Sequence, residues 1–214
     1  ASPEAARAAA EAYVQDEYAA ALLAGARLSD KQRSKVAKRL SELTGLPRAL
    51  VEEKNLRIRD RVFFAEALRA RGQVVGRLEA RSTGPRSTVV DEMEFDPGIE
   101  AIAGPYSMAA LAYFHDQLGI NTDRRYEVLS FETNRAWNWN RGEASRMGFA
   151  STSPDLALAL RRNPNLKVLA ASGRYDLGTP YSASDWSLAQ LDIPADARAR
   201  VQHRYYDAGH MMYT

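Results

Sequence analysis

The fold is decided by the stretch Lys167–Asp176, which reads KVLAASGRYD. A short, continuously apolar run of this kind is typical of a strand buried in a parallel sheet. The run ends at Gly173, and the acidic residue Asp176 follows three positions later. Further along, the strand-like run Val201–Tyr206 is followed by a glycine-containing turn that delivers His210. The pattern predicts two strands that each present a polar side chain where the strand ends.

A helix is predicted between these two strands, over Tyr181–Leu191, so that the three elements form a β-α-β unit. Because parallel strands present their carboxyl ends at the same edge of a sheet, we expect Asp176 and His210 to lie close together. Such a pair can move a proton: the imidazole acts as the base, and the carboxylate fixes its tautomer. The alternative is an ordinary turn acid beside an ordinary turn histidine.

Several segments resemble the bacterial serine carboxypeptidases, a family of α/β-hydrolases whose triad follows the order Ser, Asp, His along the chain. Asn163–Pro180 is similar to the family's acid-bearing segment, and Tyr205–Tyr213 is similar to its histidine-bearing segment. The segments that resemble the family's helical part are Ala101–Tyr106, Asn134–Trp139, and Leu43–Leu46 with Asn55–Ile58.

The resemblance implies an α/β fold, the C-terminal part of an α/β-hydrolase, with a mostly helical cap over residues 1–150 and the last part of the catalytic core over residues 151–214. It implies a serine-type carboxypeptidase that releases C-terminal residues from peptides through an acyl-enzyme. Asp176 matches the triad acid and His210 the triad base. The resemblance implies no metal and no organic cofactor, and an extracytoplasmic location, although this chain carries no targeting signal.

The nucleophilic serine of a G-x-S-x-G elbow has no counterpart in the sequence, nor do the glycines of the oxyanion hole. The first residue is not a methionine, and Thr214 lies four positions past His210, so we expect both ends to be truncated. Two strands cannot bury both faces of a sheet, so we expect the sheet to be incomplete in this chain. The missing N-terminal half of the core would come from the same polypeptide or from a companion chain, and this chain alone would be inactive. An esterase or acyltransferase of the same fold, and a non-catalytic binding remnant, are the alternatives.

Four further side chains are candidates for contact with a peptide substrate. Trp137 and Trp139 alternate in a polar segment, so they would point the same way if that segment is extended. Met211 and Met212 directly follow the histidine, and methionine adapts to varied partners. The alternative is packing within the core for the two tryptophans and packing beneath the loop for the two methionines.

The composition excludes several other functions. The chain has 29 basic and 27 acidic residues, a net charge of +2, and no cysteine, so disulfides and thiolate metal sites are ruled out. The basic segment Arg27–Arg39 resembles a helix-turn-helix, but the near-neutral charge argues against DNA binding. The acidic run Asp91–Asp96 lacks the pattern of a calcium loop. No run is long enough to span a membrane, and His203 is expected to be structural.

The remaining sequence predicts mostly helices. Expected helices are Ser2–Gly25, a second that begins with a capping box of Ser29 and Gln32 and ends at Gly45, a short one after Pro47, and others over Arg59–Arg71, Ser107–Leu118 and Ser153–Arg162. A short strand or an extended segment is expected over Val74–Glu79. A long irregular stretch is expected over residues 82–105, which hold several glycines and prolines.

Overall fold

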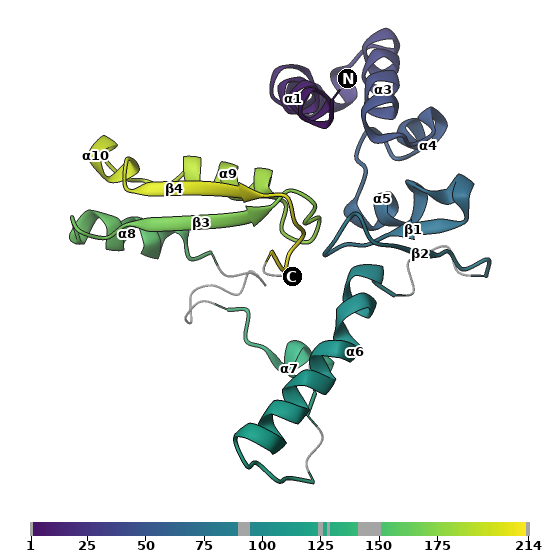
Figure 1. The fold of residues 1–214 in the computed structure, drawn as a ribbon. Helices are drawn as coiled ribbons and strands as arrows, with labels where there is room; N and C mark the ends of the chain where they lie inside the picture. Colours follow the sequence, from purple (N-terminus) through teal and green to yellow (C-terminus); the bar gives the residue numbers. More distant parts are fainter. Residues whose placement is uncertain (1, 90–94, 124–125, 128, 141–150, 213–214) are drawn as a thin grey trace. The chain divides into compact units, whose positions relative to one another are not determined.

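The computed structural model describes residues 2–89, 95–123, 126–127, 129–140 and 151–212. These residues mix helices with short strands (Figure 1) and fall into two compact units. The first unit holds Ala1–Val75 and Thr83–Glu94, and the second holds Gly76–Ser82 and Phe95–Thr214. Within the described ranges, no helix is both long and apolar enough to cross a membrane. The mixed content agrees with the α/β class, and the division into a cap over 1–150 and a core over 151–214 stays a prediction.

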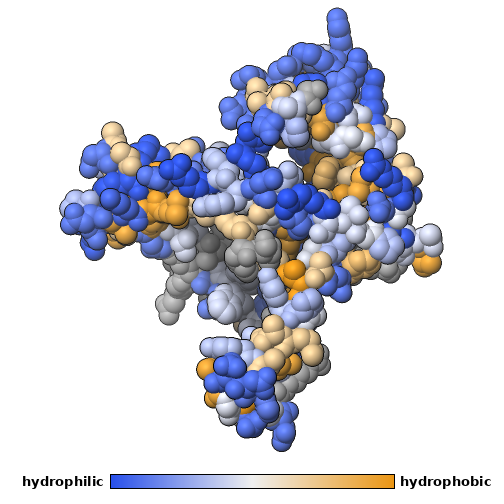
Figure 2. Space-filling view, viewed as in Figure 1, coloured by the Kyte–Doolittle hydropathy of each residue, from blue (hydrophilic) through white to orange (hydrophobic). Residues whose placement is uncertain are grey.

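The first unit is built from helices and one hairpin. Its elements are α1 (Pro3–Tyr13), η1 (Val14–Tyr18), α2 (Ala19–Ala24), η2 (Gly25–Arg27), α3 (Asp30–Thr44), α4 (Arg48–Glu53), α5 (Asp60–Glu66), η3 (Arg69–Arg71), β1 (Gln73–Val75) and β2 (Thr83–Pro85). Ser29 and Gln32 form the predicted capping box of α3, and Gly45 ends this helix with a φ of 73°. In Figure 2, apolar residues (orange) show among hydrophilic ones (blue) on the visible face of this unit.

The core of the first unit is one cluster of apolar side chains around α3. Ala37 and Val51 are fully buried, and Leu46 is 1% exposed. The chain turns at Leu56, which has a positive φ and a carbonyl that accepts the hydroxyl of Tyr18. This hydrogen bond ties the turn to η1 across the cluster, so the helices of the unit share one core.

β1 and β2 form an antiparallel hairpin, which corrects the strand predicted over Val74–Glu79. Val74 pairs with Gly84, and both Val74 and Val75 are buried. The stretch 82–105, predicted to be irregular, contains β2 and the first turns of another helix. The pattern misses β2 because Thr83–Pro85 has none of the alternating apolar residues that mark a strand.

The second unit contains α6 (Pro97–Ala112), η4 (Tyr113–Gln117), α7 (Phe131–Ala136), α8 (Ser153–Arg162), β3 (Val168–Gly173), α9 (Tyr181–Ala189), α10 (Ala195–Arg198) and β4 (Val201–Tyr206). The prediction that a helix begins at Ser107 is wrong, because α6 begins at Pro97. Asp96 caps it by accepting the N–H of Gly98 at 2.9 Å. An aspartate before a proline is a helix start signal, but Pro105 inside the helix obscures it in the sequence.

β3 and β4 pair in parallel, from Val168 opposite Val201 to Gly173 opposite Tyr206. The predicted β-α-β order is confirmed, with α9 between the strands. In the part of the chain that the structure describes, this sheet has two strands. Leu169 on β3 stays 62% exposed. The buried side chains beside the sheet are Ala157, Leu160 and Leu191, with Leu156, Leu166, Val168, Leu188, Ile193 and Val201 packed against them.

We expect Leu160→Ala to destabilise the second unit by about 2–5 kcal/mol, because Leu160 is fully buried and its truncation leaves a cavity. Leu158→Ala on the same helix is the matched control. Leu158 is 40% exposed, so its truncation should change the free energy of unfolding by about 0.5 kcal/mol or less. Urea unfolding of both variants measures the difference, and equal losses would contradict this assignment of the core.

Candidate active site

The two predicted catalytic residues lie where the paired strands end. β3 ends at Gly173 and is followed by Asp176, and β4 ends at Tyr206 and is followed by His210. Pairing continues past the strands: the N–H of Arg174 donates to the Tyr206 carbonyl at 2.9 Å, and the N–H of Tyr175 donates to the Ala208 carbonyl at 3.0 Å. The acid-bearing and histidine-bearing loops are therefore held together along their backbones.

Close backbone contact explains why glycine stands at two positions of these loops. A Cβ atom at Gly173 would lie 2.0 Å from the carbonyl oxygen of Gly209, and a Cβ at Gly209 would lie 2.4 Å from the carbonyl oxygen of Leu78. Neither position has room for a side chain unless the backbone shifts. The glycine at which the sequence pattern breaks thus permits the two loops to meet.

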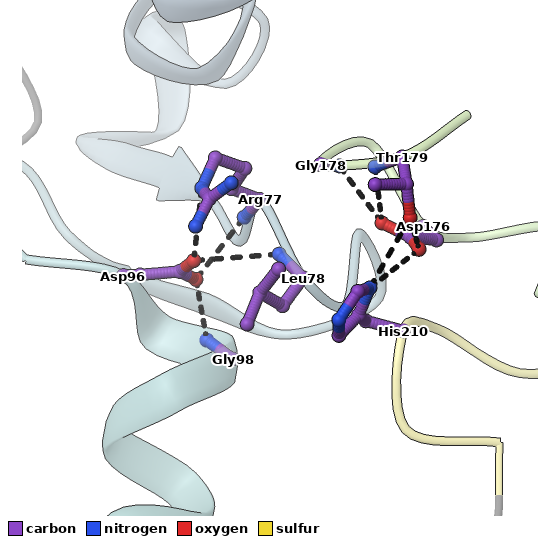
Figure 3. A network of polar contacts seen from close by, with 8 residues as sticks. All are labelled: Arg77, Leu78, Asp96, Gly98, Asp176, Gly178, Thr179 and His210. Atoms are coloured by element: carbon purple, nitrogen blue, oxygen red, sulfur yellow. Dashed lines mark hydrogen bonds and ion pairs between the residues drawn. The ribbon is translucent and has the colours of Figure 1, made fainter. Parts of the chain in front are cut away.

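Asp176 and His210 are hydrogen-bonded to each other, with 2.8 Å between Oδ2 and Nδ1 (Figure 3). Asp176 is 5% exposed, whereas the side chain of His210 is 45% exposed. An ionised carboxylate can only accept a hydrogen bond, so Nδ1 carries the N–H that it accepts, and the lone pair of the neutral imidazole is then on Nε2. Nε2 has no hydrogen-bond partner among the described residues. The pair thus has the arrangement of a base and the acid that orients it.

The Asp176 carboxylate is surrounded by donors from its own turn. Its Oδ1 accepts the N–H groups of Gly178 and Thr179 at 2.8 and 2.9 Å, and its Oδ2 accepts the Thr179 hydroxyl at 2.5 Å. Burial by itself raises the pKa of this carboxyl, but the hydrogen bonds from Thr179, His210 and Gly178 outweigh it and hold the pKa below its ordinary value. The carboxylate therefore stays ionised at neutral pH.

Thr179 belongs to the site but is not among the residues that the sequence predicts. Its Oγ1 lies 3.2 Å from Nδ1 of His210, so the hydroxyl touches both members of the pair. The spacing is a usable signal: a hydroxyl residue three positions after an aspartate in a turn is well placed to bond that aspartate.

The predicted substrate-binding residues have different surroundings. Trp137 is 61% exposed and lines an open pocket of about 540 Å³ together with Glu132, Thr133, Ala136 and Asn138. Trp139 is 49% exposed. Met211 and Met212, which follow His210 in the sequence, are half-buried. Within the described residues, no hydrogen bond or ring contact joins the tryptophans to the Asp176–His210 pair, and the role of all four stays a prediction.

A second histidine lies in a partly buried polar network on the sheet. His203 on β4 contacts Ser172 Oγ at 2.8 Å and Asp185 Oδ1 at 2.7 Å, and the Tyr205 hydroxyl donates to the same Asp185 oxygen. Ser172 lies inside a strand and is 8% exposed, so its hydroxyl faces protein and not solvent. These contacts support the structural role expected for His203. Elsewhere in the described ranges, no group of three acidic or histidine side chains is placed to hold a metal ion.

The basic face of α3 is partly neutralised within its own unit. Lys35 pairs with Glu17 at 2.6 Å, and Arg39 pairs with Glu42 at 3.2 Å. Pairs of this kind are typical of a solvated helix face and weaken the case for DNA binding. Of the acidic run Asp91–Asp96, residues 91–94 lie outside the described residues, and Asp96 caps α6.

We expect the lowered pKa of Asp176 to make folding depend on pH. A carboxyl whose pKa is lower in the folded state adds stability above its unfolded pKa of 3.8, and this stability is lost as the pH falls through the folded value. Between about pH 5 and pH 2, the free energy of unfolding measured with urea should fall more steeply for the wild type than for Asp176→Asn. Asp192→Asn, whose side chain is 97% exposed, should follow the wild type. Identical slopes for Asp176→Asn and the wild type would contradict the prediction.

Comparison with models of known families, with curated proteins and with solved structures finds no match to this chain. The assignment of the site therefore depends on its own geometry. That geometry is an ionised, buried aspartate bonded to an exposed histidine at the carboxyl ends of two parallel strands.

Proposed function

We propose that this chain supplies the acid and the base of a serine-type hydrolase with an α/β-hydrolase core. The observation that carries the proposal is the 2.8 Å hydrogen bond between Asp176 Oδ2 and His210 Nδ1 at the ends of β3 and β4. Loops at the carboxyl ends of parallel strands are where sheets of this class hold their ligands. Only the imidazole is open to solvent, as a proton-transfer group must be.

In the proposed reaction, Nε2 of His210 takes the proton from a serine hydroxyl as the serine oxygen bonds to a carbonyl carbon of the substrate. The imidazolium then gives this proton to the leaving group, and the bond to that group breaks, which leaves an acyl-enzyme. A water molecule, deprotonated by His210, then attacks the acyl-enzyme in the same way. The serine oxygen recovers the proton, and the carboxylic acid product is released. Asp176 remains ionised throughout, holds the Nδ1–H tautomer and stabilises the imidazolium.

The serine is proposed to come from the rest of the hydrolase core, on the same polypeptide or on a companion chain. The 214 residues contain no G-x-S-x-G motif. We propose a carboxypeptidase that acts on peptides from an extracytoplasmic location, and this step depends on the sequence resemblance alone. The same acid and base would also serve an esterase or acyltransferase of this fold.

Labelling of the native full-length protein with a fluorophosphonate, followed by mass analysis, tests the proposal. We expect the label on one serine outside these 214 residues, because the probe reacts with a serine activated by a histidine. His210→Ala should slow labelling and peptide hydrolysis by about 10⁴-fold, the usual cost of losing a triad base.

His115→Ala is the matched control, because the side chain of His115 is 69% exposed and bonded to its neighbour Asp116. It should label at the rate of the wild type. A His210→Ala variant that keeps more than about a tenth of the wild-type rate would overturn the proposed base. If the protein is labelled and cleaves esters but not peptides, the proposed activity would be that of an esterase and not of a carboxypeptidase.

A further inference from the structure

An extended segment distant in sequence holds both loops of the candidate site. We call residues 77–80 the strap. The Leu78 carbonyl accepts the backbone N–H of His210 at 2.7 Å. The Arg77 carbonyl accepts the N–H of Leu177 at 2.9 Å, and the N–H of Ala80 donates to the Tyr175 carbonyl at 2.9 Å. The strap therefore bonds to the acid-bearing loop on both sides of Asp176 and to the histidine itself.

Side chains of the strap and its neighbour add contacts to the same loops. The backbone N–H of Gly209, the residue before His210, helps to lower the pKa of the Glu79 carboxyl. The guanidinium of Arg81 pairs with Glu79 at 2.8 Å and stacks over the ring of Tyr175, with 4.4 Å to its centroid. Hydrogen bonds from Arg81 lower the pKa of Glu79 below its ordinary value, so this carboxylate is charged at neutral pH.

One buried carboxylate holds the strap in place. Asp96 is 9% exposed, and its two oxygens accept the N–H groups of Arg77 at 3.1 Å and Leu78 at 3.3 Å (Figure 3). It also caps α6 through the N–H of Gly98 and lies 3.8 Å from the guanidinium of Arg77. Figure 3 shows Leu78 between this carboxylate and His210.

The backbone of Leu78 thus links Asp96 to His210 through two hydrogen bonds. Asp96 holds the N–H of Leu78, and the carbonyl of Leu78 holds the N–H of His210. Loss of the Asp96 bonds would leave two backbone N–H groups of the strap unpaired in a partly buried site, so the strap would move to find new partners. Movement of the Leu78 carbonyl would release the backbone of His210, while the Asp176 turn keeps its own internal bonds.

We propose that Asp96 is a positioning residue for His210, acting through the backbone of Leu78 to hold the imidazole against Asp176. This proposal depends on the proposed function, because it gives Asp96 a part in the reaction of the same site. Catalytic groups need placement to a fraction of an ångström, and a displacement of about 1 Å can cost about 10²-fold in rate.

Asp96→Ser separates the two tasks of this carboxylate. A serine is a good helix cap, so α6 keeps its start, but its single short hydroxyl cannot also hold the N–H groups of Arg77 and Leu78. Backbone hydrogen exchange measured by NMR on the native full-length protein should show the His210 N–H exchanging about tenfold faster in Asp96→Ser. The Arg174 N–H, which bonds to Tyr206, should keep its wild-type rate.

Arg77→Met is the matched control, because it removes the ion pair with Asp96 and keeps the backbone N–H groups that Asp96 accepts. The His210 N–H should exchange at the wild-type rate in this variant. Nitrogen shifts of the imidazole give a second readout: Asp96→Ser should reduce the population of the Nδ1–H tautomer at His210 and leave His203 unchanged.

Equal acceleration at His210 and Arg174 would mean that Asp96 only stabilises the fold, and no acceleration at His210 would mean that the strap is held without it. Either result overturns the proposal. These readouts need no serine and no turnover, so they are independent of the labelling test of the proposed function. In the full-length protein, Asp96→Ser should lower kcat by about tenfold or more with KM little changed.

Discussion

The candidate site depends on the in-register pairing of β3 with β4. Parallel strands that end together place the residues that follow them at one edge, and here the strand-end pair Gly173 and Tyr206 sets that edge. The loops beyond it can approach only because Gly173 and Gly209 lack side chains. A shift of one residue in the pairing would turn the side chains of a strand to its other face and move the two loops apart.

A buried carboxylate is costly unless donors surround it, and the chain supplies these donors locally. Asp176 accepts the backbone N–H groups of Gly178 and Thr179 and the hydroxyl of Thr179, before any contact with His210 is counted. The ionised form is therefore a property of the turn. The histidine then meets a carboxylate that is already charged and oriented, which is the preorganised electrostatics that catalysis needs.

The parts of the site that the sequence predicts are those set by local pattern. The apolar run before Gly173 and the helix between the strands predict that Asp176 and His210 meet, and the structure places them 2.8 Å apart. Thr179, Leu78 and Asp96 are not predicted. Thr179 needs the turn geometry to be known, whereas the Leu78 and Asp96 contacts join residues far apart in sequence. The periodicity of the sequence does not predict contacts between residues that are far apart along the chain. The early start of α6 had a local signal at Asp96, but Pro105 concealed it.

His203 and His210 show why residue type alone does not identify a catalytic group. His203 has a serine and an aspartate within hydrogen-bond distance, the same set of residue types that a triad uses. It lies inside β4, where both ring nitrogens are bonded and its side chain is 9% exposed. His210 lies beyond the strand, where one ring nitrogen is bonded to a buried carboxylate and the side chain is 45% exposed. A catalytic base must be able to reach the groups with which it exchanges a proton, so the position after the strand end, and not the set of neighbours, separates the structural role of His203 from the role proposed for His210.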